Sequence, residues 1–96
     1  MDFEWDTQKS TRNAHTRGFD FAFARLVFQG PCLVREDRRR DYGERRMIAV
    51  GRVEGVHLTV VYTDRITQDG RTLRRIMSAR RSNRRERQAY AEDRRG

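Results

Sequence analysis

The stretch that decides the fold is Leu73-Arg74-Arg75-Ile76-Met77-Ser78-Ala79-Arg80-Arg81-Ser82-Asn83-Arg84-Arg85-Glu86-Arg87-Gln88-Ala89-Tyr90. Its apolar run around Ile76 and Met77 is typical of an inner strand of a sheet. Asn83 can cap a helix, and Glu86 follows three residues later, at the spacing of a capping-box partner. The predicted order is therefore strand, tight junction and helix, with arginines on both sides of the junction.

Two helices are predicted before this unit. Asp6 can cap a polar helix over residues 7–17, which Gly18 ends as the left-handed residue past its C-terminus. A second helix over residues 21–29 follows Asp20 and is ended by Gly30-Pro31. The apolar stripe of this second helix includes Phe21, Ala24 and Phe28, so we expect the helix to cover the sheet.

Three further strands are predicted over residues 32–36, 47–53 and 56–63. Glu54-Gly55 has the pattern of a two-residue hairpin turn in which the glycine supplies a positive φ. Strands joined by short turns are antiparallel, whereas residues 2–5 fit either a short strand or an extended lead-in. The prediction is one α+β domain over residues 1–96, with two N-terminal helices, an antiparallel sheet of about four strands and a C-terminal helix, frayed at residues 94–96.

Positive charge is segregated along the chain. Residues 65–96 hold eleven arginines and four acids, a net charge of +7, whereas residues 1–64 hold ten arginines, one lysine and ten acids, a net charge of +1. Arginine binds phosphate through its planar fork and stacks on bases. Codon usage in a genome rich in G and C explains part of the arginine bias, but not its segregation, which indicates a surface for polyanions.

Several classes of protein do not fit the sequence. The single cysteine, Cys32, cannot form an intramolecular disulfide, and the two histidines, His15 and His57, lie far apart without a CxxC motif, so no metal site or cofactor is expected. The acidic N-terminus does not resemble a signal peptide. No apolar run approaches the roughly 20 residues that span a bilayer. We therefore expect a cytoplasmic protein that has no contact with membranes.

The remaining side chains suit chemistry on RNA. The 2′-hydroxyl of RNA can attack its adjacent phosphate if one group removes its proton, cationic donors stabilise the phosphate, and another group protonates the leaving oxygen. Arginine suits the second task and not the first, because it hardly deprotonates. The composition therefore fits a ribonuclease that needs no metal, and equally a protein that only binds nucleic acid.

Most individual candidates also have an ordinary structural explanation. A strand histidine such as His57 is more often satisfied or solvated than catalytic, Tyr62 fits the core with its hydroxyl at the rim, and Tyr90 fits a contact between the last helix and the sheet. Arg80 and Arg81, at a strand end beside a helix start, are the hardest to explain as solvated charge.

Several motifs together resemble one family, the BrnT-type toxins of bacterial type II toxin–antitoxin pairs. The resemblance covers residues 3–91 in the same order, and each motif is weak alone. The motifs are Phe3-Glu4-Trp5-Asp6, Asn13 through Phe21, Val27-Phe28, Arg45 with Met47-Ile48-Ala49-Val50-Gly51, Val60-Val61-Tyr62-Thr63-Asp64-Arg65, Ile76-Met77-Ser78-Ala79-Arg80-Arg81, Arg85-Glu86-Arg87 and Tyr90.

The resemblance implies a RelE-like fold and a metal-independent endoribonuclease that inhibits translation. It also implies a cognate BrnA-type antitoxin, dimeric through a DNA-binding domain, so that the pair forms a heterotetramer. In such a pair the toxin reaches operator DNA only through the antitoxin.

The resemblance further implies that arginines and aromatic residues of these motifs line the RNA site. Mapped onto this chain, the catalytic candidates are Arg80, Arg65, Arg45 and Tyr62, and the substrate-binding candidates are Arg81, Arg46, Trp5, Arg17 and His15. One position departs from the family pattern, because Arg17 stands where the family usually has histidine, and His15 lies two positions earlier.

Two other hypotheses remain open from the sequence. One is a non-catalytic module that binds nucleic acid or acts as a corepressor with its partner, which predicts salt-sensitive binding without cleavage. The other is a structural subunit of a larger RNA–protein assembly.

Overall fold

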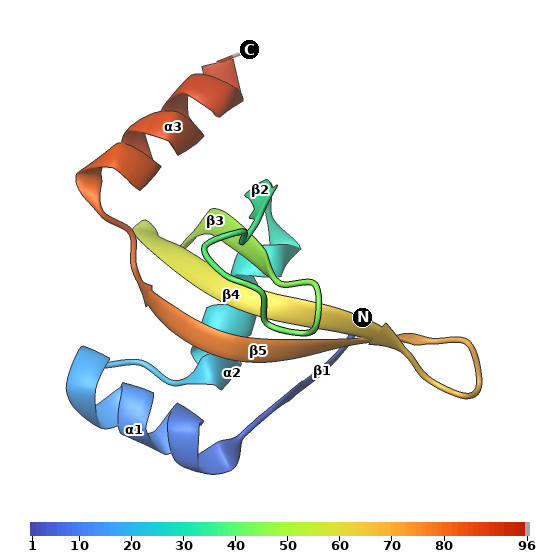
Figure 1. Ribbon diagram of the computed structural model, residues 1–96. Helices are drawn as coiled ribbons and strands as arrows, with labels where there is room; N and C mark the ends of the chain where they lie inside the picture. The colour runs from blue at the N-terminus through green and yellow to red at the C-terminus, as the bar shows by residue number, and fades with distance from the viewer. Residues whose placement is uncertain (96) are drawn as a thin grey trace.

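The protein is an α+β structure in which helices cover one face of a mostly antiparallel sheet (Figure 1). The computed structural model describes residues 1–95. Its elements in chain order are β1 (Asp2–Trp5), α1 (Thr7–Arg17), α2 (Phe21–Ala24), the 3₁₀ helix η1 (Arg25–Gln29), β2 (Leu33–Glu36), β3 (Met47–Val53), β4 (Val56–Ile66), β5 (Thr72–Arg81) and α3 (Arg84–Arg95). The predicted α+β class and the RelE-like arrangement are confirmed.

The five strands of the sheet have the order β1-β5-β4-β3-β2. Neighbours from β2 to β5 run antiparallel, whereas β1 pairs in parallel with β5, with Trp5 opposite Ile76. The predicted inner strand is confirmed, because β5 lies between β1 and β4. Residues 2–5, for which the sequence left a strand or an extended lead-in open, form the strand β1, so the sheet within residues 1–95 has five strands and not about four.

The core lies between the helices and one face of the sheet. Residues from α2 and η1, namely Phe21, Ala24 and Val27, pack against Leu58 and Val60 of β4 and against Ile76 and Ala79 of β5. Gly51 permits this close approach, since a Cβ there would lie 2.5 Å from Cγ2 of Val27. The predicted cover over the sheet is therefore confirmed.

Residues 21–29 form one turn of α-helix followed by the 3₁₀ helix, and not a single α-helix. The Gly30 amide donates to the Val27 carbonyl, which closes the last turn in the 3₁₀ pattern. A 3₁₀ helix rises about 2.0 Å per residue, so the chain advances faster toward β2 than an α-helix allows.

The predicted turn between β3 and β4 is confirmed, with one addition. Both central residues have positive φ, 49° at Glu54 and 81° at Gly55. This is the type I′ geometry, whose twist matches that of the flanking strands.

The loop of residues 37–46 crosses the face of the sheet that the helices leave free (Figure 1). Asp37 anchors it, because its side chain is fully buried and accepts two bonds of 2.8 Å from Arg39. The Asp37 amide also donates to the Arg46 carbonyl at the other end of the loop. The Thr63 hydroxyl of β4 donates to the Arg45 carbonyl, which ties the loop to the sheet.

The capping box predicted at the start of α3 is confirmed. The Asn83 amide donates to Oε1 of Glu86 and the Glu86 amide donates to Oδ1 of Asn83, both at 2.8 Å. The helix projects from the sheet (Figure 1), and Tyr90 is its one buried residue. As predicted, Tyr90 packs the helix against the sheet, since its ring contacts His57 of β4 edge-on. Its hydroxyl also donates to the Pro31 carbonyl.

The helix α3 continues through Arg95, and Gly96 lies outside the described residues. Within residues 1–95, no helix combines the length and the apolar character needed to cross a membrane.

Candidate nucleic-acid interface

Two predicted catalytic arginines, Arg45 and Arg65, lie together where β4 leads into the hairpin to β5. They line a pocket of about 470 Å³ with Glu4, Glu44, Thr63, Asp64 and Arg75. Arg65 pairs with Glu4 at 3.1 Å, Arg75 pairs with the same carboxylate at 3.7 Å, and Arg45 pairs with Glu36 at 2.9 Å. Three arginines and three acids line this pocket, so it offers little net charge to a phosphate.

Tyr62 lies on the other face of the sheet from these arginines. Its ring is 4% exposed, and the guanidinium of Arg74 lies 4.2 Å from its centroid and 4.7 Å from that of Phe28. Arg74 in turn donates two bonds of 2.8 Å to Asp64. Burial raises the pKa of Tyr62, so its hydroxyl stays protonated inside a structural stack.

Arg80 is held at the opposite end of β5, five residues beyond Arg75 and thus about 16 Å away along the strand. Its guanidinium donates to both carboxylate oxygens of Glu86, at 2.7 and 2.8 Å. Glu86 also accepts from the Thr59 hydroxyl. The bonds from Arg80, above all, lower the pKa of Glu86 to about 2. Arg80 therefore joins the start of α3 to the sheet, and Glu86 offsets its charge.

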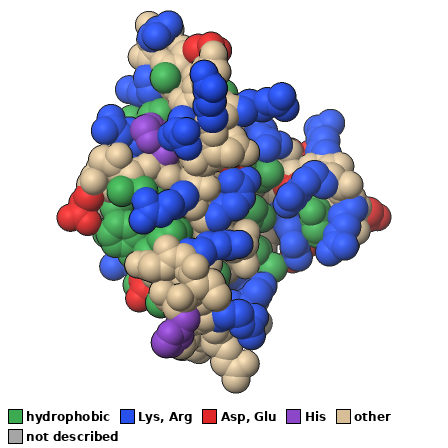
Figure 2. Space-filling model, turned by 90° about the vertical axis from the view of Figure 1, so that its left-hand side faces the viewer, with side chains coloured by type: hydrophobic (Ala, Val, Ile, Leu, Met, Phe, Trp, Pro, Cys, Tyr) green, Lys and Arg blue, Asp and Glu red, His purple; other side chains and the backbone are tan. Residues whose placement is uncertain are grey.

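A set of cations without carboxylate partners lies beside Arg80, and we call it the cationic band. Its members are Lys9, Arg12 and Arg17 of α1, Arg81 of β5 and Arg87 of α3, and none of them has a carboxylate within salt-bridge distance in residues 1–95. Figure 2 shows lysine and arginine side chains spread over this side of the molecule, from α3 at the top to α1 at the bottom.

Hydrogen bonds to β5 and its junction hold the band together. Nη1 of Arg17 donates to the Ala79 carbonyl at 2.9 Å, and Nη1 of Arg87 donates to the Ser82 carbonyl at 2.7 Å. The two guanidinium groups thus contact backbone positions only three residues apart. They connect α1, the end of β5 and α3 into one surface.

A small notch lies between α1 and β5 within this surface. Its volume is about 180 Å³, and the side chains that line it are Lys9, Arg12, Asn13, Thr16, Arg17, Phe21, Met77 and Ser78. The pairing of β4 with β5 shifts here, because Val61 faces Ser78 whereas Tyr62 faces Ile76, which leaves Met77 as an extra residue. Such bulges are common next to functional sites because they redirect side chains. The notch offers three cations and two hydroxyls, and no carboxylate lines it.

His57 lies beside the band and was not among the candidates mapped from the resemblance. Its half-buried ring packs edge-on against Tyr90, with centroids 5.5 Å apart. Burial lowers its pKa, and the nearby charges of Arg52 and Arg87 lower it further. The imidazole is therefore neutral at neutral pH and able to accept a proton. The two-residue turn at Glu54-Gly55 was the available signal, because it fixes the hairpin register that places His57 across from Arg52.

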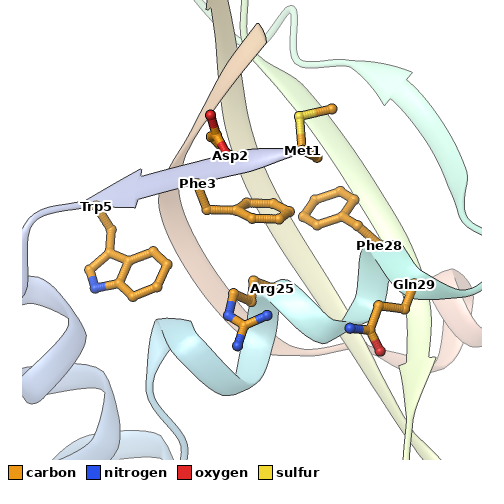
Figure 3. Close-up of a pocket in the computed structure, with 7 residues that line it drawn as sticks. All are labelled: Met1, Asp2, Phe3, Trp5, Arg25, Phe28 and Gln29. Atoms are coloured by element: carbon orange, nitrogen blue, oxygen red, sulfur yellow. The ribbon is translucent and has the colours of Figure 1, made fainter. Parts of the chain in front are cut away.

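Trp5 and Arg46 lie apart from the band, whereas His15 shares a surface depression with Arg12, a member of the band. Trp5 lines a pocket between β1 and η1 (Figure 3). Arg46 stacks on the Tyr42 ring at 4.1 Å, and His15 lines a shallow depression on α1 with Thr7, Gln8, Thr11 and Arg12. The fold thus brings Arg17, Arg80 and Arg81 to one end of the sheet and Arg45 and Arg65 to the other.

Among residues 1–95, no three or more His, Cys, Asp and Glu side chains are grouped closely enough to hold a metal ion.

A family model described as the ribonuclease toxin, BrnT, of type II toxin–antitoxin systems matches residues 5–86. No curated protein matches the chain.

Proposed function

Because the chain belongs to the BrnT family of ribonuclease toxins of type II toxin–antitoxin systems, we propose that it cleaves RNA without a metal ion and thereby inhibits translation. The observation that carries the proposal is the cationic band. Its five cations have no carboxylate partner among residues 1–95, whereas those of the hairpin end are paired. A phosphate that approaches the band therefore displaces no internal ion pair.

In this proposal the RNA backbone runs along the band from α1 to α3. The notch of Lys9, Arg12 and Arg17 takes one phosphate, with the hydroxyl of Ser78 as an additional donor. Arg81 and Arg87 contact the next stretch of backbone. Arg80 acts as a positioning residue, because its pairing with Glu86 fixes the start of the helix that carries Arg87.

The proposed chemistry uses the 2′-hydroxyl of the RNA as nucleophile. His57 accepts its proton, the 2′-oxygen attacks the adjacent phosphorus, and the bond to the 5′-oxygen breaks to leave a 2′,3′-cyclic phosphate. Water protonates the departing 5′-oxygen. Arg81 and Arg87 stabilise the negative charge that builds on the phosphate. His57 suits the first step better than Tyr62, because burial keeps the tyrosine hydroxyl protonated while the imidazole is neutral.

The test is cleavage of single-stranded RNA by the purified protein and by two histidine variants. We expect His57→Gln to cleave about 100-fold more slowly or worse, the usual loss for a proton-transfer group, while His15→Gln retains full activity. Because the base must be neutral, wild-type activity should rise with pH through the lowered pKa of His57 and then level off. The His57 variant should lack this acid limb.

The outcomes separate the hypotheses. Wild-type protein that binds RNA in a salt-sensitive manner without cleaving it would favour the non-catalytic or corepressor module. Cleavage by His57→Gln at the wild-type rate would reject His57 as the proton acceptor. It would not contradict the proposal that the cationic band binds the RNA backbone.

The membership in a type II system implies a cognate antitoxin. We propose that it is of the BrnA type, that it dimerises and forms a heterotetramer with two toxin chains, and that operator DNA is bound only through it. Light scattering of the co-purified complex tests the stoichiometry, and a 1:1 heterodimer would contradict it.

A further inference from the structure

The strand β1 is an edge of the sheet with an aromatic pocket beside it. Within residues 1–95, β5 is its one neighbour, so its outer side has no strand partner there. Phe3 and Trp5 point from this strand toward η1, where Phe28 and Arg25 complete a pocket of about 460 Å³ (Figure 3). The Phe3 and Phe28 rings stack with centroids 5.7 Å apart. All three aromatic side chains are only half-buried, so each retains apolar surface for a further contact.

Arg25 gives this pocket a free positive charge. It has no carboxylate within salt-bridge distance in residues 1–95, whereas the acids of β1 are already paired, Asp2 with Arg71 at 3.0 Å and Glu4 with Arg65 at 3.1 Å. In Figure 3 Arg25 lies on the helix side of the pocket, below the Phe3 and Phe28 rings. A ligand that carries one carboxylate next to an apolar group matches this arrangement.

The surroundings favour a protein segment over RNA. Asp2, Glu4 and Asp6 place three acids on or beside the strand, which disfavours a chain of phosphates. The pocket has one cationic side chain, in contrast to the five of the cationic band. An exposed strand edge also offers backbone donors and acceptors in the pattern that an added strand satisfies.

We propose that the outer edge of β1 and the aromatic pocket bind an extended segment of the cognate antitoxin. The segment pairs with β1 as an added strand and places an apolar side chain against Trp5, Phe3 and Phe28. An acidic side chain of the same segment pairs with Arg25. This inference rests on the proposed function only in taking the antitoxin as the partner, and it concerns a surface separate from the cationic band.

The experiment measures the affinity of the toxin for the antitoxin encoded by the neighbouring gene, purified separately. We expect Arg25→Glu to bind at least 10-fold more weakly, because the reversed charge repels the acidic side chain. The matched control is Arg35→Glu on β2, the other edge strand, which also lacks a carboxylate partner in residues 1–95 and is exposed. It should bind within 2-fold of the wild type.

Two further measurements keep the inference testable if a variant is unstable. Trp5→Ala should weaken binding at least 30-fold, the loss typical of a central aromatic anchor, provided that circular dichroism shows an intact fold. In the wild-type complex, amide hydrogens of residues 3–5 that face outward should exchange at least 10-fold more slowly than in free toxin. Unchanged exchange together with unchanged affinity of Arg25→Glu would overturn the proposal.

The remaining outcomes identify other occupants. Weaker RNA binding by Arg25→Glu with unchanged antitoxin affinity would assign the pocket to a nucleobase and reject the proposal. A concentration-dependent toxin dimer that Arg25→Glu dissociates, with unchanged antitoxin affinity, would assign the pocket to a second copy of this chain and also reject it. A wild-type toxin that leaves RNA intact but binds the antitoxin through Arg25 would overturn the proposed function alone.

Discussion

Replacing Glu86 with glutamine tests whether the junction between β5 and α3 is a structural hub. The Glu86 carboxylate accepts bonds from Arg80 at 2.7 and 2.8 Å, from the Asn83 amide at 2.8 Å and from the Thr59 hydroxyl at 3.1 Å. Its side chain is 11% exposed. Glutamine has nearly the same shape but carries no charge, so the substitution removes the ion pair and leaves the size of the side chain unchanged.

The size of the effect follows from the lowered pKa of Glu86. A fall from about 4.5 to about 2 corresponds to an upper limit of about 3 kcal/mol in the free energy of unfolding, at about 1.4 kcal/mol for each pH unit. The Arg80 side chain is 40% exposed, and solvent screens its half of the pair. We therefore expect Glu86→Gln to lower the free energy of unfolding at pH 7 by about 1–2 kcal/mol.

The pH dependence gives a second signature with a defined sign. The pKa of Glu86 is lower in the folded protein than in the unfolded chain, so its contribution is fully present above about pH 5. It is lost as the pH falls toward 2, where the carboxylate takes up a proton. The difference in stability between wild type and Glu86→Gln should therefore shrink over this range, although other acids make both proteins less stable.

Urea unfolding followed by circular dichroism at pH 7, 5, 4 and 3 measures this difference. The control is Glu92→Gln on the same helix, an exposed carboxylate without a salt-bridge partner in residues 1–95, which should change stability by less than about 0.5 kcal/mol. If Glu86→Gln matches this control at pH 7, or if its deficit does not shrink in acid, the ion pair with Arg80 does not stabilise the junction.

Three other predictions concern packing, anchoring and charge. Gly51→Ala should lower the free energy of unfolding by about 1–3 kcal/mol, because its Cβ would lie 2.5 Å from Cγ2 of Val27. When Val27→Ala is added, the total loss measured by urea titration should be smaller than the sum of the two single losses. Tyr90→Phe removes the bond to the Pro31 carbonyl and should cost about 0.5–1.5 kcal/mol in the same assay. Arg12→Gln should reduce the slope of the logarithm of RNA affinity against the logarithm of salt concentration by about 0.7, whereas Arg65→Gln, whose charge is paired with Glu4, should leave the slope unchanged.

The features that the sequence predicted well are local ones. The capping box requires only Asn83 and Glu86, three residues apart, and the hairpin turn requires only Glu54 and Gly55. The cap of α1 is equally local, since Asp6 accepts from the amides of Gln8 and Lys9, two and three residues ahead. Each of these signals depends on backbone geometry within one turn, so it does not require knowledge of the tertiary fold.

The features that were missed depend on contacts between distant parts of the chain. Arg65 meets Glu4 across 61 positions and Arg17 meets the Ala79 carbonyl across 62. The parallel pairing of β1 with β5 requires the whole chain between them, which is why residues 2–5 remained undecided. The sequence placed Tyr62 in the core, but the stacking of Arg74 on Tyr62 and Phe28 depends on how η1 packs on the sheet.

Ion pairing decides where the positive charge of this protein acts, and a sum along the sequence does not reveal it. Of the eleven arginines in residues 65–96, five have carboxylate partners among the described residues 1–95, namely Arg65, Arg71, Arg74, Arg75 and Arg80. A close pair is nearly neutral beyond the screening distance of about 8 Å in physiological salt. An approaching RNA therefore responds mainly to the unpaired cations. Part of this surface, Lys9, Arg12 and Arg17, belongs to the N-terminal segment, whose net charge of +1 gave no sign of it.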